Sequence, residues 1–161
     1  GFFEQTNLVT LTTVDFLQSM GNDMPVKGMH GFARAPFFML QDNAKARAFT
    51  AAYKARYNKD PDDWAVLTYD GLMFYAEAVR HAKSTKADDV MKAVGSIKYS
   101  GLRGDMNVRG LDGQMNAPSF VGVVGKDPAF PYMGLKDGVR VEAAQTMPTE
   151  AAIRAGRAAA K

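Results

Sequence analysis

The chain has 161 residues, of which 47% are hydrophobic and 23% are charged, a composition that is typical of globular proteins and excludes disorder as an overall description. It contains no run of the roughly 20 apolar residues that a membrane-spanning helix requires, and the absence of cysteine excludes disulfides, thiolate metal sites and a cysteine nucleophile. The formal net charge is +3, but the charges are scattered apart from a mildly basic tail around Arg154 and Arg157, so we predict no nucleic-acid partner.

The first half of the chain alternates between strand-like and helix-like patterns. In chain order, the predicted elements are a strand over residues 7–11, a helix over 13–20, a strand over 26–32, and helices over 43–57 and 64–83. Thr12 is the predicted N-cap of the first helix, with Asp15 in the capping-box position. The predicted caps of the next two helices are Asp42 or Asn43, and Asp62 or Asp63.

The second half of the chain is richer in glycine and in predicted strands than the helical middle. A further helix is predicted to end at residue 94 and to begin at a capping-box pair, Thr85 and Asp88. The later elements are a glycine-rich stretch over 95–113, a strand over 119–124, a returning strand over 139–143 with Asp137-Gly138 as the hairpin turn, and an alanine-rich helix over 149–160. Strands on both sides of a helical middle predict an α/β fold with mixed strand pairing.

The sequence offers little that indicates catalysis. The only histidines are His30 and His81, too few for a clustered metal site. The adjacent carboxylates at 62–63 and 88–89 fall at predicted helix starts, where capping explains them. Neither phosphate-binding glycine spacing nor a G-x-S-x-G nucleophile motif occurs. We therefore predict a protein that is not an enzyme and that has no cofactor and no metal.

The most informative local segment lies where the first strand gives way to the first helix. Ligands of α/β proteins gather at the carboxyl ends of strands, and backbone N–H groups at a helix start attract anions. The predicted ligand-binding residues are Thr10, Leu11, Thr12 and Thr13. Simple capping of the helix is the alternative interpretation of the two threonines that begin it, and Asp15 serves either as a cap or as a cleft residue.

Residues 46–83 carry a recognisable pattern. The runs are RAF at 47–49, Tyr53, RYNK at 56–59, Pro61 and TYDG at 68–71. This pattern resembles the F-x-x-x-Y-x-x-x-Y-x-x-x-P…YDA stretch of periplasmic solute-binding proteins of the branched-chain amino acid (Leu/Ile/Val-binding) type. The later runs YSG-x-x-G at 99–104 and G-x-DGQ at 110–114 resemble the same family, as do residues 11–21 and 26–28, so that the resemblance covers about residues 5–125.

The resemblance implies an architecture. Members have two three-layer α/β lobes that are joined by a hinge and close on a solute, and they deliver it to the membrane subunits of an ABC importer. It therefore implies a partial α/β fold of the type I periplasmic-binding-protein kind. Residues 1–33 correspond to a lobe-two segment, 34–116 to a lobe-one segment, and 117–161 to a return to lobe two and a C-terminal tail. The implied hinge residues are Phe32, Ala33, Arg34 and Ala35.

The resemblance also bears on partners and location. Because family chains are more than twice as long, we expect this chain to be a C-terminal portion with exposed apolar faces, which pair with the missing N-terminal portion or with a second copy. The complete protein is expected to be exported to the periplasm, although no signal peptide is visible in this chain.

The resemblance leaves the solute open. A glutamate that binds the amino group in amino acid binders falls near Leu11, so a carboxylate, aromatic acid or amide fits as well as an amino acid. Tyr69 and Asp70 are predicted to support the lobe near the cleft, with core packing as the alternative for Tyr69. Other functions left open are a ligand-sensing domain of a signalling receptor and a small enzyme.

Overall fold

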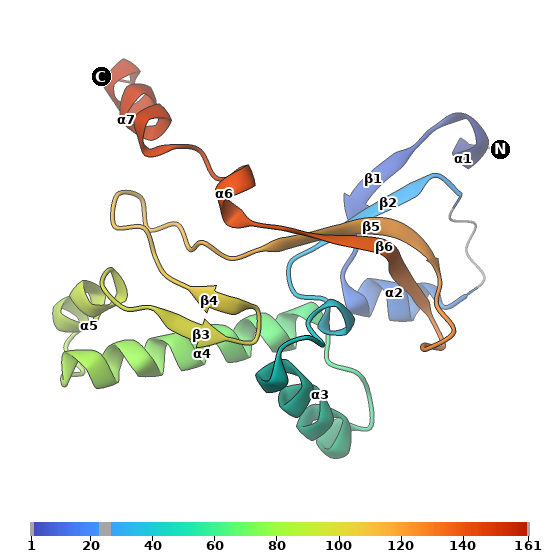
Figure 1. Ribbon diagram of the computed structural model, residues 1–161, viewed down its shortest axis with the longest axis horizontal. Coiled ribbons are helices and arrows are strands. Elements are labelled where there is room, and N and C mark those ends of the chain that lie inside the picture. Colours follow the sequence, from blue (N-terminus) through green and yellow to red (C-terminus); the bar gives the residue numbers. More distant parts are fainter. Residues whose placement is uncertain (1, 23–26, 161) are drawn as a thin grey trace.

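The computed structural model describes residues 2–22 and 27–160 of the chain (Figure 1). The strands are β1 (Leu8–Leu11), β2 (Met29–Ala33), β3 (Tyr99–Gly101), β4 (Gly104–Met106), β5 (Ser119–Lys126) and β6 (Met133–Val141). The helices are α1 (Phe2–Gln5), α2 (Val14–Met20), the 3-10 helix η1 (Phe37–Met39), α3 (Ala44–Tyr57), α4 (Asp63–Ala82), α5 (Ala87–Val94), α6 (Ala143–Thr146) and α7 (Glu150–Ala159). The predicted α/β class and the predicted order of the main elements are confirmed.

The main sheet joins two parts of the chain that lie far apart in the sequence. Its strand order is β1-β2-β5-β6, with β1 parallel to β2 and with β5 antiparallel to both of its neighbours. The predicted mixed pairing is therefore confirmed. The intervening segment adds helices α3 to α5 and the separate β3–β4 hairpin. One sheet thus contains strands from the predicted segments 1–33 and 117–161, whereas their assignment to a lobe stays a prediction.

One face of the main sheet forms the principal core. Side chains along β2 alternate, so that Met29 and Ala33 are buried while His30 and Phe32 are exposed, as the period of two in a strand requires. The buried face packs against α2 and η1, including Leu17 and Phe37, and Figure 1 shows α2 lying below the sheet. Each fully buried large apolar side chain contributes roughly 1.5–3 kcal/mol. This face therefore accounts for much of the stability of the fold.

The opposite face of the sheet is apolar yet open. Its exposed side chains are Val9, Leu11, Phe32, Val121, Val123 and Val139, and Val9 is 69% exposed. Contiguous apolar surface of this kind marks an interaction surface in a protein that is stable in water. The exposed apolar faces expected from the sequence are therefore present.

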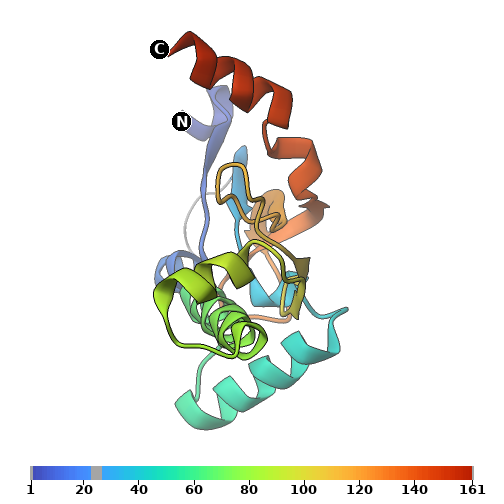
Figure 2. The ribbon, with the colours of Figure 1, turned by 90° about the vertical axis from the view of Figure 1, so that its left-hand side faces the viewer.

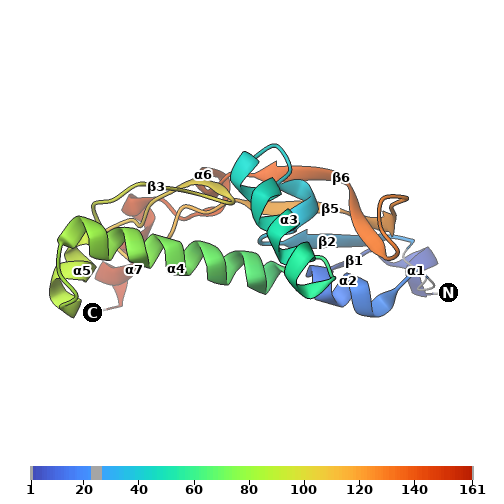
Figure 3. The ribbon, with the colours of Figure 1, turned by 90° about the horizontal axis from the view of Figure 1, so that it is seen from below.

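Helix α4 connects this core to a second one. Val66, near its start, belongs to the principal core, whereas Phe74 and Ala78 pack with Val90 and Ala93 of α5. Figure 3 shows α4 extending from the neighbourhood of α2 and α3 to α5 at its far end. A helix of 20 residues is roughly 30 Å long, which is enough to span both cores.

The last helix, α7, has little contact with the core of the protein. None of the residues of α7 is buried, and Figure 2 shows α7 well separated from α4 and α5. Polar contacts attach this region: Arg157 donates to the Leu111 carbonyl at 3.0 Å, and Arg109 donates to the Pro148 carbonyl at 2.8 Å. The predicted helix over 149–160 is confirmed.

Two strand predictions need correction. Asp137-Gly138 is not a hairpin turn but lies within β6, where the register with β5 shifts between Val121 and Val123. Asp137 has a φ of 51°, so the pair forms a left-handed bulge, which accounts for the turn-like signal. The hairpin turn falls instead between Lys126 and Met133. The strand predicted over 26–32 is observed as β2, which begins at Met29. Residue 26, the first residue of the predicted strand, lies outside the described residues.

Two predicted capping boxes are wrong. The N-cap of α2 is Thr13 rather than Thr12, and neither the Thr13 side chain nor Asp15 forms the predicted box. The N-cap of α5 is Lys86, so Thr85 and its partner Asp88 do not form a box either. At the start of α2, the Thr12 hydroxyl donates to the Thr10 carbonyl at 3.0 Å instead of capping the helix.

The caps of the two long helices are confirmed. Asn43 accepts the Lys45 N–H at 2.9 Å at the start of α3, and Asp62 accepts the Ala65 N–H at 2.7 Å at the start of α4. Each interaction satisfies a backbone donor that the first helical turn leaves without a partner. Asp63, the alternative cap, is placed inside α4 and has a different role, described below.

Candidate functional site

The predicted ligand-binding and hinge residues meet at one edge of the main sheet. Because β1 and β2 are parallel, their carboxyl ends are neighbours, and Leu11 pairs with Phe32 in the register. The two segments remain paired just beyond the end of β1, since the Thr12 N–H donates to the Phe32 carbonyl at 2.8 Å. The structure thus brings residues 10–13 and 32–35 together, as an α/β site at the carboxyl ends of strands requires.

Within this edge, the threonine side chains face the interior. The Thr12 side chain is fully buried, and its hydroxyl donates to the Thr10 carbonyl at 3.0 Å. Thr12 packs directly over Gly31, where any Cβ would overlap the Thr12 hydroxyl. Thr13 is buried as well. These contacts shape the turn from β1 into α2, and ligand contact through residues 10–13 stays a prediction.

The accessible side chains at this edge lie on the open face of the sheet. Leu11 is 43% exposed and Phe32 is 40% exposed, and their pairing places them side by side. Arg34, two residues after Phe32, is also exposed. The carboxyl ends of β1 and β2 therefore offer an apolar surface next to a guanidinium group.

A buried carboxylate fastens this edge to α4. Asp63, in the first turn of α4, accepts the Val14 N–H at 2.8 Å through Oδ2 and the Ala35 N–H at 2.9 Å through Oδ1. Burial raises the pKa of the Asp63 carboxyl, although the two backbone N–H groups act in the opposite direction. One side chain thus links the start of α2, the segment after β2, and α4. Sequence reasoning missed this role because both partners lie far away in the chain.

The predicted hinge residues have distinct positions. Phe32 and Ala33 end β2, while Arg34 and Ala35 follow it. Arg34 lines a cavity of about 340 Å³ together with residues of α4, the β3–β4 turn, the approach to β5, and the end of α6. The other lining residues are Leu67, Arg103, Gln114, Met115, Ala117, Pro118, Ser119, Thr146 and Met147. The cavity is therefore lined by residues from the predicted segment 34–116 and from the predicted segment 117–161.

Tyr69 and Asp70 lie further along α4. Asp70 is buried and accepts the Leu102 N–H at 2.7 Å and the Arg103 Nε–H at 3.0 Å, so it holds the β3–β4 turn. The Tyr69 ring packs on Phe49 of α3, with the ring centres 4.8 Å apart. Both residues support the packing around α4, while support of a solute cleft stays a prediction for both.

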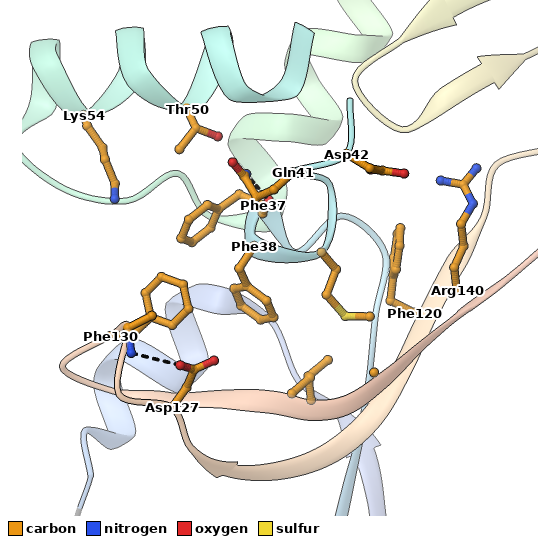
Figure 4. A pocket seen from close by; sticks show the side chains of 14 residues that line it. Phe37, Phe38, Gln41, Asp42, Thr50, Lys54, Phe120, Asp127, Phe130 and Arg140 are labelled. Carbon is orange, nitrogen blue, oxygen red and sulfur yellow. Dashed lines mark hydrogen bonds between the residues drawn. The ribbon is translucent and has the colours of Figure 1, made fainter. Parts of the chain in front are cut away.

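A larger cavity that sequence reasoning missed lies between η1, α3 and the β5–β6 hairpin (Figure 4). Its volume is about 720 Å³, within the range of small-molecule sites. Its walls include the rings of Phe37, Phe38 and Phe130, and its rim carries both acids and bases. These residues come from three separate stretches, so no local motif indicates the cavity.

The described residues do not assemble a metal centre. Across 2–22 and 27–160, no three His, Asp or Glu side chains are grouped so that they could hold a metal ion. In the same part of the chain, no helix is both long and apolar enough to cross a membrane.

Comparison with known proteins places the chain among binding proteins. The sequence matches the model of the family described as Periplasmic binding protein over residues 5–129. The fold is similar to that of an amino acid ABC transporter substrate-binding protein from Pseudomonas fluorescens Pf-5, with a TM-score of 0.75 and 18% identity over 92% of this chain and 39% of that chain.

Two further solved structures were determined with a small molecule. A solute binding protein of an ABC transporter from Rhodopseudomonas palustris BisB5, in complex with 3,4-dihydroxy benzoic acid, has a TM-score of 0.62 and 20% identity over 77% of this chain and 34% of that chain. A branched-chain amino acid transporter substrate binding protein from Streptococcus pneumoniae, in complex with isoleucine, has a TM-score of 0.56 and 18% identity over 71% of this chain and 30% of that chain. The chain thus spans between 30% and 39% of the length of these three proteins.

Proposed function

Because the chain belongs to the periplasmic binding protein family, we propose that it supplies part of the solute-binding component of an ABC importer. The family resemblance and the partial type I fold predicted from the sequence are both confirmed. The proposed activity is capture of a small solute, without chemical conversion. The complete protein is proposed to work in the periplasm and to deliver its solute to the membrane subunits of the transporter.

The proposed mechanism is closure of two lobes around the solute. Residues 1–33 and 117–161 are assigned to lobe two, residues 34–116 to lobe one, and Phe32, Ala33, Arg34 and Ala35 to the hinge. The observation that carries this proposal is the junction at Asp63, whose carboxylate accepts N–H groups from the start of α2 and from the segment after β2. Asp63 of α4 thus contacts both a residue assigned to lobe two, Val14, and a residue assigned to the hinge, Ala35, which supports a meeting of the two lobes at this point.

The exposed side chains at this edge limit the solute class. Leu11 and Phe32 offer apolar contact and Arg34 offers a cation, which together suit a solute that has an apolar group and a carboxylate. We therefore propose an amino acid, carboxylate, aromatic acid or amide as the solute. The similar structures that hold isoleucine and 3,4-dihydroxy benzoic acid support this range. Thr12 and Thr13 are proposed to act by shaping the turn that presents Leu11.

The open apolar surfaces support a further part of this proposal. Val9 and Val139 on the open sheet face are well exposed, as are Trp64 and Leu72 on α4. Leaving this much apolar surface in water is unfavourable by roughly 25 cal/mol for each Å². We propose that the missing N-terminal portion of the polypeptide, or a second copy of this chain, covers these surfaces.

Calorimetry on the complete polypeptide that contains this sequence tests the function. The solute panel consists of apolar amino acids, aromatic carboxylates and their amides. For the solute that binds, Leu11→Ala and the pair Thr12→Val with Thr13→Val should weaken binding about tenfold, while Val139→Ala, on the same face but on β6, two strands away from β2, should leave it unchanged. Absence of binding across the panel contradicts the function, and unchanged affinity in the Leu11 and threonine variants contradicts the site.

A further inference from the structure

The cavity of about 720 Å³ is built at the seam between η1–α3 and the β5–β6 hairpin. Phe37 and Phe38 come from η1, Phe130 comes from the hairpin turn, and Thr50 and Lys54 come from α3 (Figure 4). None of the predicted solute or hinge residues lines it. It is therefore separate from the proposed solute site and could bind a different ligand.

Three aromatic rings form one wall of the cavity. The ring centres of Phe37 and Phe38 are 5.5 Å apart, those of Phe37 and Phe130 are 5.6 Å apart, and those of Phe38 and Phe130 are 5.5 Å apart. Phe38 and Phe130 are only partly buried, so they retain ring surface that faces the cavity. Ring faces carry negative electrostatic potential and attract cations.

The charged rim has an excess of acid. Its two cations already have acidic partners, because Lys54 pairs with Asp60 at 2.5 Å and Arg140 pairs with Glu142 at 2.5 Å. Two further carboxylates, Asp42 and Asp127, also line the cavity. The rim and its partners thus comprise two cations and four carboxylates, which favours a positively charged ligand.

The two lining carboxylates keep acceptor capacity. Asp42 makes no ion pair within the described residues, although Figure 4 shows it pointing toward Arg140. From the residues that the structure describes, the Asp127 carboxylate accepts only the Ala129 N–H, at 2.9 Å through Oδ1. A carboxylate has about four acceptor positions, so both can take further N–H donors.

A buried hydroxyl adds a third acceptor. Thr50 is 8% exposed and lines the cavity. Its hydroxyl oxygen can accept a hydrogen bond from an N–H donor inside the cavity.

From these features we propose that this cavity binds a small organic cation, namely a protonated amine that carries an apolar or aromatic group. Because Lys54 already lies over the Phe37 ring, 5.6 Å from its centre, the ligand's ammonium group lies against Phe38 and Phe130. It donates to Asp42, Asp127 and Thr50, while the apolar group packs on Met39 and Phe120. Since one wall comes from η1 and α3 and the other from the β5–β6 hairpin, the bound amine joins both sides of the seam.

A charge series on one scaffold tests the ligand class. Calorimetry on the complete polypeptide compares phenethylammonium with 2-phenylethanol, which is neutral, and with 3-phenylpropionate, which is an anion of similar size. We expect phenethylammonium to bind at least about tenfold more tightly than either, as a charge-assisted hydrogen bond predicts. Equal or tighter binding of the anion overturns the proposal, and so does the absence of amine binding.

A matched set of variants locates the binding. Asp42→Asn combined with Asp127→Asn keeps the side-chain volumes, and an Asn at position 127 can still accept the Ala129 N–H. Far-UV circular dichroism should therefore show an unchanged fold. We expect the double variant to lose about tenfold or more in amine affinity, and Asp88→Asn, an exposed acid on α5, to lose none. An unchanged affinity in the double variant shows that the amine binds elsewhere and refutes the site.

Discussion

Replacing Asp63 with alanine tests the junction at the strand ends most sharply. The Asp63 side chain is 1% exposed and accepts two backbone N–H groups, from Val14 at 2.8 Å and from Ala35 at 2.9 Å. Asp63→Ala leaves both donors buried without an acceptor. Because the two donors belong to segments far from α4 in the sequence, the variant also loosens three elements at once.

The magnitude follows from the two donors. A buried donor that loses its partner costs about 1–3 kcal/mol, so the two together cost about 2–6 kcal/mol. The substitution also removes an unfavourably buried charge, which offsets part of this loss. We therefore expect the free energy of unfolding to fall by the lower part of that range, about 2–4 kcal/mol.

Urea denaturation followed by circular dichroism measures this loss. Asp62→Ala is the matched control, because Asp62 is the adjacent carboxylate and caps α4 by a single bond to Ala65. Loss of an N-cap costs about 1 kcal/mol. If Asp63→Ala is no more destabilising than Asp62→Ala, Asp63 does not anchor the junction and the reasoning fails.

The same carboxyl predicts a pH dependence with a defined sign. Burial raises the pKa of Asp63 above its ordinary value of 3.8, so folding favours the protonated form. Its contribution to stability is complete below the ordinary pKa and is lost as the pH rises through the raised pKa. Relative to Asp63→Asn, which does not ionise, the wild-type chain should therefore lose stability as the pH rises from the ordinary pKa. A wild-type stability that rises with pH relative to that of Asp63→Asn contradicts this.

Three further predictions concern other parts of the chain. Gly31→Ala should lower the free energy of unfolding by about 1–3 kcal/mol in urea, because the new Cβ overlaps the Thr12 hydroxyl; an unchanged midpoint contradicts the packing. The hydrogen bond from Arg109 lowers the pKa of Asp112 to about 2, so its stabilising effect is present above the ordinary pKa and is lost as the pH falls toward 2; NMR titration should find this value, and it should rise in Arg109→Gln. Leu72→Lys, at an exposed apolar position of α4, should reduce self-association of the 161-residue chain in sedimentation velocity, and unchanged association shows that this surface of α4 is not the contact.

The sequence predicts the long helices well because their signals are local. Asn43 and Asp62 each cap a helix within three residues. The apolar spacing along α4 does not identify the face that packs, because Leu72 is exposed whereas Phe74 and Ala78 are buried. The same local reasoning fails at Asp137-Gly138, because a left-handed bulge and a hairpin turn require the same residue types. The pairing with β5 decides between them, and that pairing is not local.

The candidate site was only partly accessible to sequence reasoning. The strand end at Leu11 and the segment after Phe32 are both evident from pattern and resemblance, and the parallel pairing of β1 and β2 brings them together. The role of Asp63 depends on partners 28 and 49 residues away, which no spacing rule reveals. The aromatic cavity is hidden for the same reason, since Phe37 and Phe130 meet only in the folded chain.

Small-angle X-ray scattering of the complete polypeptide, with and without the solute found by calorimetry, tests the central claim most directly. Closure of two lobes on a solute predicts a smaller radius of gyration at saturating solute than in its absence. An identical radius of gyration in both states, for a solute whose binding is confirmed under the same conditions, contradicts capture by lobe closure.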